Sequence, residues 1–203
     1  MATLVNVWIE GTYALLMCRF GDAAAESVQR GARRVQIQEE LPRDVAERCV
    51  YRDKAGAMCW PGASIARLLR DAGANHKQRG SRRAIKYIVP AAVVVVEEHF
   101  PLYLVDRATR AKDFEVDSRR CVIHATKGSV MRHRARIEKW SARLTLRVNE
   151  NVLPADMIRQ LLVEGGAQIG IGDFRPEKGG PFGTFDLVSW DDAGKLGHVA
   201  AAE

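Results

Sequence analysis

Apolar segments with the periods of strands and helices occur twice along this chain, in the same order. A strand-like alternation is followed by a segment with the 3.6-residue period of a helix and then by a second strand-like run, and the same succession returns in the C-terminal part. The segments are residues 3–9, 60–73 and 85–96, and then 140–148, 153–166 and 184–190. The sequence therefore predicts two strand–helix–strand halves.

Two such halves in one chain predict an α+β protein with a ferredoxin-like βαββαβ core. In that plan the strands form an antiparallel sheet and both helices cover the same face of it. All 203 residues are expected to form a single domain, because a hydrophobic content of 47% suffices for one packed core. Insertions interrupt the core at about 21–59, which includes a short helix at 42–48, and at 107–138. The tail 191–203 has little to pack and is expected to fray.

Local signals set the expected character and ends of the core elements. The segment 85–96 is dense in Val and Ile, which predicts a central strand buried on both faces. Gly73 is expected to end the first long helix, and Gly165-Gly166 the second. These ends leave 75–86 as a loop between the first helix and the following strand.

The positive charge of the chain is concentrated in its middle. The net charge is +6, but residues 61–140 carry seventeen basic and eight acidic side chains, a net charge of +9. Such a concentration indicates a polyanionic partner such as a nucleic acid, with a solvated arginine-rich surface as the alternative. Within the basic loop 75–86, the residues predicted to hold phosphates are Lys77, Arg79, Arg82, Arg83 and Lys86.

A predicted β-hairpin supplies the second set of basic residues. Two strand-like runs, 119–126 and 129–137, are joined through Lys127-Gly128. Because side chains alternate between the two faces of a strand, Arg132, Arg134 and Arg136 are expected to share one face. We expect all three arginines to be exposed and to bind phosphates.

A glycine-rich segment, residues 170–183, follows the second helix and precedes the last strand. This order and the absence of GxxxxGK[ST] exclude a nucleotide-hydrolase phosphate loop and a dinucleotide fingerprint. Glycines let the backbone approach a ligand closely, Phe174 and Phe182 could stack on bases, and Asp173 could orient Arg175 by an ion pair. The alternative is a turn that only closes the connection. The predicted binding residues are Gly170, Gly172, Arg175, Lys178 and Gly179.

This glycine-rich segment fits the pattern GxGxxRxxxxGxFGxF, and it resembles the glycine-rich loop of the RAMP superfamily of CRISPR-associated RNA-binding proteins. The N-terminal strand with Gly11-Thr-Tyr-Ala-Leu-Leu-Met17 also resembles the first strand and turn of that superfamily. The resemblance implies the ferredoxin-like fold, and it implies that the hairpin within 107–138 matches the thumb of the crRNA-coating backbone subunits. A diverged relative, phage- or plasmid-borne, is included in that expectation.

Charge and resemblance together predict a non-catalytic protein that binds nucleic acid, with single-stranded RNA favoured over single-stranded DNA. It is expected to self-associate or to assemble with other subunits along the strand. One alternative is a metal-independent endoribonuclease of the same superfamily, with its acid–base residue among His76, His99, His124 and His133. The other is a protein-interaction module, such as a phage-encoded mimic of a CRISPR subunit. None of the histidines lies in a recognisable motif, so no catalytic residue is assigned.

The remaining signals concern compartment and cofactors. The longest apolar run, Val89–Val96, is interrupted by Pro90 and is far shorter than the roughly 18 residues of a membrane helix. The N-terminus lacks the basic residues and cleavage site of a secretory signal. The cysteines at 18, 49, 59 and 121 form no CxxC pair, which argues against a zinc site or a disulfide framework. We therefore expect a cytoplasmic protein without metal, cofactor or membrane partner.

Overall fold

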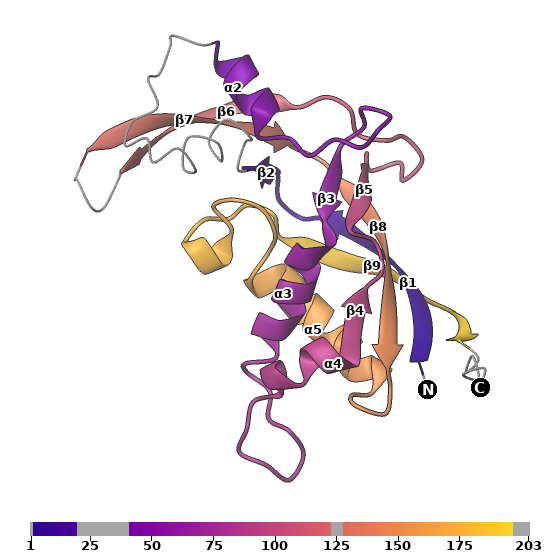
Figure 1. The fold of residues 1–203 in the computed structure, drawn as a ribbon. Coiled ribbons are helices and arrows are strands. Elements are labelled where there is room, and N and C mark those ends of the chain that lie inside the picture. Colours follow the sequence, from indigo (N-terminus) through magenta and orange to yellow (C-terminus); the bar gives the residue numbers. More distant parts are fainter. Residues whose placement is uncertain (1, 20–40, 123–127, 197–203) are drawn as a thin grey trace, which may run out of the picture.

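The computed structural model describes residues 2–19, 41–122 and 128–196. Its main sheet has the strand order β3-β5-β8-β1-β9, with β4 also paired to β8, and every pairing is antiparallel (Figure 1). The strands are β1 (Ala2–Gly11), β3 (Cys59–Pro61), β4 (Val93–Val95), β5 (His99–Tyr103), β8 (Ser141–Asn149) and β9 (Phe185–Leu196). With helices between β1 and β4 and between β8 and β9, this is the predicted ferredoxin-like α+β core.

The two central strands, β1 and β8, confirm the alternation in the sequence. They pair over their whole length, from Ala2 opposite Asn149 to Glu10 opposite Ser141. Val5, Val7 and Ile9 of β1 are fully buried, whereas the residues between them are only half-buried. One face of this sheet is therefore the floor of the hydrophobic core, as the period of two predicts.

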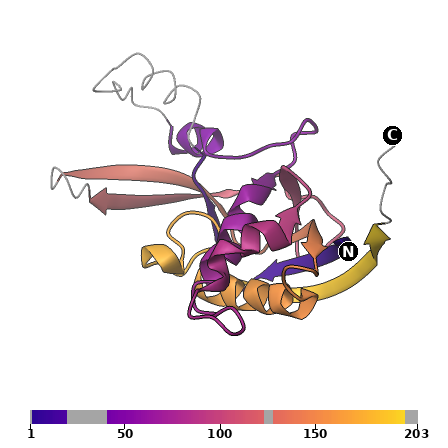
Figure 2. The same cartoon turned by 60° about the horizontal axis from the view of Figure 1, so that its bottom comes forward.

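The two long helices, α3 (Gly62–Ala72) and α5 (Ala155–Gln168), cover that floor side by side (Figure 2). Helix α3 ends before Gly73, as predicted, but α5 continues through Gly165-Gly166, where its end was expected. A Cβ atom on Gly165 would lie 2.3 Å from the Leu68 Cδ2 atom of α3. The glycine therefore serves close helix packing and is not a helix stop.

The prediction of a buried strand over 85–96 is wrong. This segment forms the short 3₁₀ helix η1 (Ile85–Tyr87), the single turn α4 (Val89–Ala92) and only then β4. Pro90 lies at the start of α4, where its missing N–H is tolerated. Val89 and Val93 are buried but Val94 is exposed, so the run does not lie in a sheet covered on both faces.

A second, three-stranded sheet stands beside the core, with the order β2-β7-β6 (Figure 1). It comprises β2 (Leu15–Met17), β6 (Glu115–Val122) and β7 (Ser129–Ile137), and helix α2 (Pro42–Arg48) packs against β6 and β7. The predicted hairpin is therefore present, with its first arm starting earlier than expected. Its connection at 123–127 lies outside the described residues.

The C-terminal strand is longer than predicted. Strand β9 continues past Trp190 to Leu196, which pairs with Ala2. Residues 197–203, and residues 20–40 of the first insertion, lie outside the described residues. Among the helices in the described part of the chain, none combines the length and apolar character needed to cross a membrane.

Candidate nucleic-acid interface

The glycine-rich loop folds back onto the connection between β1 and β2. The Gly183 N–H donates to the Ala14 carbonyl at 2.8 Å, and the Asp173 N–H donates to the Leu16 carbonyl at 2.9 Å. Because β2 pairs with β7, these bonds place the loop against the base of the hairpin. The structure therefore brings the loop and the hairpin together, although sequence separates them.

The predicted glycines divide into two kinds. Gly172 has φ +85°, and a Cβ atom there would lie 2.7 Å from the Leu16 carbonyl oxygen, so the fold itself requires glycine. Gly170, at φ +69°, is similarly close to the Gly183 carbonyl. Gly179 has φ +79°, yet no atom lies within 4 Å of its Cβ position. Of these three, Gly179 is the one at which a ligand could approach the backbone.

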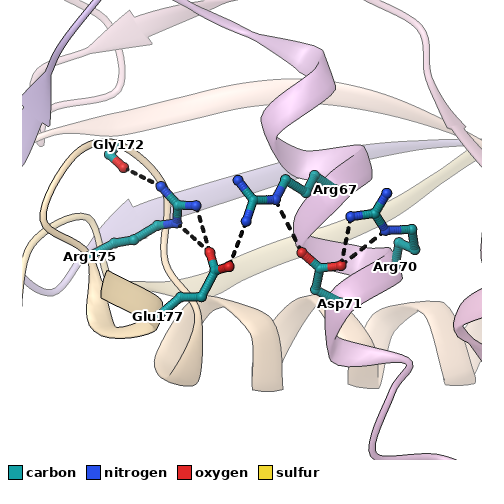
Figure 3. Close-up of polar contacts among 6 residues, drawn as sticks. All are labelled: Arg67, Arg70, Asp71, Gly172, Arg175 and Glu177. Atoms are coloured by element: carbon teal, nitrogen blue, oxygen red, sulfur yellow. Dashed lines mark hydrogen bonds and ion pairs between the residues drawn. The ribbon is translucent and has the colours of Figure 1, made fainter. Parts of the chain in front are cut away.

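Arg175 has a different partner from the one expected. Its guanidinium donates to Glu177 at 2.5 Å and to the Gly172 carbonyl at 2.8 Å, while Asp173 does not bind it. Glu177 in turn accepts from Arg67 of α3 at 2.6 Å. Figure 3 shows the resulting chain of alternating charges, which links Arg67, Arg70, Asp71, Gly172, Arg175 and Glu177. The guanidinium of Arg175 is largely buried and joins two parts of the loop, while Glu177 connects the loop to α3 through Arg67.

The three arginines on one face of β7 have different environments. Arg134 is buried, and its Nε atom lies 2.5 Å from the Asp173 carboxylate of the glycine-rich loop. Arg136 pairs with Glu138. Arg132 is exposed, and no ion pair to it is found within the described residues. The expectation of three exposed arginines therefore holds only for Arg132. Arg134 is buried because the loop supplies a carboxylate that the sequence does not place, and Arg136 is half-buried beside Glu138.

The first arm of the hairpin adds two arginines that the sequence prediction did not include. Arg119 is held by both carboxylate oxygens of Asp117 at 2.9 Å, and its guanidinium lies 4.6 Å from the Phe182 ring centroid. Arg120 is exposed and, like Arg132, has no ion pair within the described residues. The signal for both was available, because they lie in the arm predicted to pair with the one that carries Arg132.

An aromatic cluster borders these arginines. The buried Phe182 ring is flanked by Tyr13, edge-on at 5.3 Å, and by Phe174 at 6.1 Å. Tyr13 and Phe174 are exposed by 47% and 37%, and Phe174 has the positive φ of +49° that is uncommon for such a residue. The guanidinium beside these rings is that of Arg119, which is paired with Asp117. Exposed rings near arginine side chains are a combination on which single-stranded nucleic acids stack.

The basic loop 75–86 lies elsewhere. It is at the opposite end of α3 from the hairpin (Figure 1), and Lys77, Arg79, Arg82 and Arg83 are all exposed. Lys86 is half-buried, with its ammonium 5.0 Å from the Tyr87 ring centroid. The basic residues of the loop 75–86 and those of the hairpin belong to the same basic region of the sequence, but they lie on two separate surfaces of the folded protein.

Two cysteines contact each other beside the hairpin, where the Cys49 thiol donates to the His133 carbonyl of β7 at 3.9 Å. The Cys49 side chain hydrogen-bonds Cys18, and this contact lowers the pKa of the exposed Cys18 thiol to about 6. The same contact, together with burial, raises the pKa of the Cys49 thiol. Within the described ranges no three His, Cys, Asp or Glu side chains are placed to hold a metal ion.

The histidines considered for catalysis are dispersed. His76 contacts Glu164 at 2.6 Å, which lowers the pKa of that carboxyl, and His133 contacts the Ser118 hydroxyl at 2.7 Å on the hairpin. His99 contacts the ring of Tyr51. His124 lies outside the described residues.

The comparison with known proteins finds solved structures that are similar to this chain, but no protein with a similar sequence. No family model matches the chain, and no curated protein matches its sequence. A chain from the cryo-EM structure of the Type III-B Cmr-beta bound to cognate target RNA superposes with a TM-score of 0.54 at 15% identity over 94% of this chain, which spans 60% of the length of that chain. The crystal structure of Cmr6 from Pyrococcus furiosus gives a TM-score of 0.48 at 9% identity, over 93% of this chain and 99% of that one. The first likeness establishes a shared fold.

Proposed function

We propose that this protein binds single-stranded RNA with the hairpin and the glycine-rich loop, as a non-catalytic subunit of RAMP type that assembles with other subunits along the RNA. One observation carries the proposal. Two exposed arginines without ion pairs in the described structure lie on the hairpin: Arg132 on the face of Arg119, which contacts the Phe182 ring between Tyr13 and Phe174, and Arg120 on the opposite face.

The ion pairs around these residues give each group a role. Arg134 and Arg175 hold the loop in place, since their charges are matched by Asp173 and Glu177. Arg120 and Arg132 have no ion-pair partner within the described residues, so their guanidinium groups can bind an external anion. The planar guanidinium fork matches the geometry of a phosphate. Bases of a single strand are free to stack on the exposed rings, whereas bases of a duplex are not.

Two further observations support RNA over DNA. The glycine-rich loop and the N-terminal turn resemble those of a superfamily of RNA-binding proteins. The fold is shared with a chain whose complex was solved bound to a target RNA. Both observations concern other proteins, so the choice between the two nucleic acids is part of the proposal and is tested directly.

The test is a fluorescence anisotropy titration with single-stranded RNA and DNA of the same sequence, at ~50 and ~200 mM salt. We expect tighter binding to RNA and a steep loss of affinity with salt, because each neutralised phosphate releases counterions. Replacing both Arg120 and Arg132 with Ala should weaken binding by roughly tenfold or more and flatten the salt dependence.

The matched control removes two exposed arginines from the open face of the main sheet, Arg143→Ala with Arg147→Ala. This variant has the same net charge as the hairpin variant and should retain most of the affinity. Equal losses in the two variants would mean that only the overall charge matters, and the proposal would then be wrong.

A further inference from the structure

A cavity of about 690 Å³ lies beside β3 and β5, and none of the predicted phosphate-binding residues lines it. Its wall is built from the turn that contains Tyr51 and Lys54, from His99 at the start of β5, and from Arg19 just after β2. Its volume is within the range of small-molecule sites, which is about 300–1,000 Å³. Because β2 pairs with the hairpin, Arg19 links this cavity to the proposed RNA interface.

The apolar part of the cavity consists of aromatic rings in fixed positions. Tyr51 packs edge-on against the buried Trp60 at 5.6 Å and 74°, so the tyrosine ring is supported from behind. The exposed His99 ring lies 5.8 Å from Tyr51 at 41°. Two neighbouring rings in the lining of a cavity can stack against a flat partner such as a base.

The charged part of the cavity is basic. Its lining includes four basic residues and one acidic residue, Asp53, whose carboxylate is bound by Arg110 at 2.7 Å. Arg52 is held by Glu47. The ammonium of Lys54 has no ion pair within the described residues, and the guanidinium of Arg19 lies 5.9 Å from the Tyr51 ring centroid. The positive charge of Lys54 therefore remains beside the rings.

Titration behaviour agrees with a built site. Burial raises the pKa of Tyr51 and of Cys59, and the Glu47 carboxylate raises the pKa of Arg52. Shifted groups gathered around one cavity are more common at functional sites than elsewhere on a surface.

We propose that this cavity binds one nucleotide unit, with the base against Tyr51 and His99 and the phosphate on Lys54. The inference rests on the proposed RNA binding, since the nucleotide in the cavity would be part of the bound RNA strand. A free nucleotide has the same chemistry and could also fill the cavity. The experiment below distinguishes the RNA strand from the free nucleotide.

The experiment adds adenosine 5′-monophosphate, inorganic phosphate or single-stranded RNA to the full chain and follows the imidazole proton signals by NMR. The His99 signal is assigned with His99→Ala. We expect the nucleotide or the RNA to shift the His99 signal upfield, because a stacked base shields it. Lys54→Ala with His99→Ala should weaken RNA binding about fivefold, whereas Lys139→Ala, an exposed lysine elsewhere, should not.

The outcomes are distinct. A shift with the mononucleotide supports a site that also takes free nucleotide, and a shift with RNA alone supports a site for the strand. Phosphate that moves the same signals as strongly as the nucleotide overturns the proposal, because the rings would then have no role. So does wild-type RNA affinity in the Lys54/His99 variant. Failure of the proposed RNA binding itself is read separately, from the Arg120/Arg132 variant.

Discussion

Arg132 and Arg134 are two positions apart on the same face of β7, but they differ in what a substitution should do. Arg134 is buried beside Asp173, and removing one partner of a buried ion pair leaves the other charge unpaired. Because Asp173 is 31% exposed, we expect Arg134→Ala to lower the free energy of unfolding by about 2 kcal/mol, less than for a fully buried pair.

Arg132→Ala is the matched control, and its effect on stability should stay within about 0.5 kcal/mol, as for most exposed residues. Urea unfolding of the two variants measures both values. Equal stabilities would show that the contact between the loop and the hairpin contributes nothing to folding.

The thiol of Cys18 provides a pH-dependent prediction at the same scale. A thiolate reacts with iodoacetamide and a thiol does not, so the rate should follow the fraction ionised. With the pKa of Cys18 at about 6, its alkylation rate should be half-maximal near pH 6, well below the usual value of about 8.5. Cys49→Ala removes the largest cause of the shift and should move the midpoint upward. Mass spectrometry of the labelled peptide checks this, and an unchanged midpoint would contradict the contact.

The glycine-rich loop carries a prediction at the scale of the element. Gly172 and Gly179 both have positive φ, so alanine at either position meets a backbone cost of about 1–2 kcal/mol. Only at Gly172 does the new Cβ also collide with a carbonyl, that of Leu16. Gly172→Ala should therefore lower the melting temperature more than Gly179→Ala does. Thermal unfolding ranks the two, and the reverse order would mean that the loop does not pack on β2 as described.

Elements were predictable where one local pattern determines them. Strands β1 and β8 alternate cleanly, and α3 has both an apolar stripe and a glycine directly after its last residue. The strand predicted over 85–96 is wrong because a run of Val and Ile has no period that separates a helical turn from a strand. The sequence predicts a helix stop at Gly165 because its neighbour Leu68, on another helix, is not visible in the local sequence.

The candidate site was partly predictable for the same reason. The sequence contains the arginines and the glycines, but it does not state which carboxylate each arginine meets. Asp173 binds Arg134, and Glu177 binds Arg67, because the fold brings the loop to the hairpin and to α3. The cavity at Tyr51 had no sequence signal, since its lining comes from four separate segments.

At the scale of the whole molecule, the two segments predicted to hold phosphates, the hairpin and the loop 75–86, lie at opposite ends of α3 (Figure 1). RNA that fills only the hairpin surface cannot reach the loop. Replacing Lys77, Arg79, Arg82 and Arg83 with Ala should therefore leave the affinity for a ~6-nucleotide RNA unchanged and reduce that for a ~30-nucleotide RNA, with a smaller salt dependence. Anisotropy with both lengths tests this. Equal losses for both RNAs would place the loop within the hairpin site.

The connections between the two sheets have a mechanical consequence. Only residues 12–14 separate β1 from β2, and only residues 138–140 separate β7 from β8. Both joints lie at the same end of the paired strands β1 and β8, since Glu10 is opposite Ser141. A force applied to the hairpin therefore pulls both central strands in the same direction, and these two strands do not slide past each other. The load falls on the backbone hydrogen bonds of β1 and β8 to the outer strands, and these bonds must break together in shear. The hairpin is therefore mechanically coupled to the core with high stiffness.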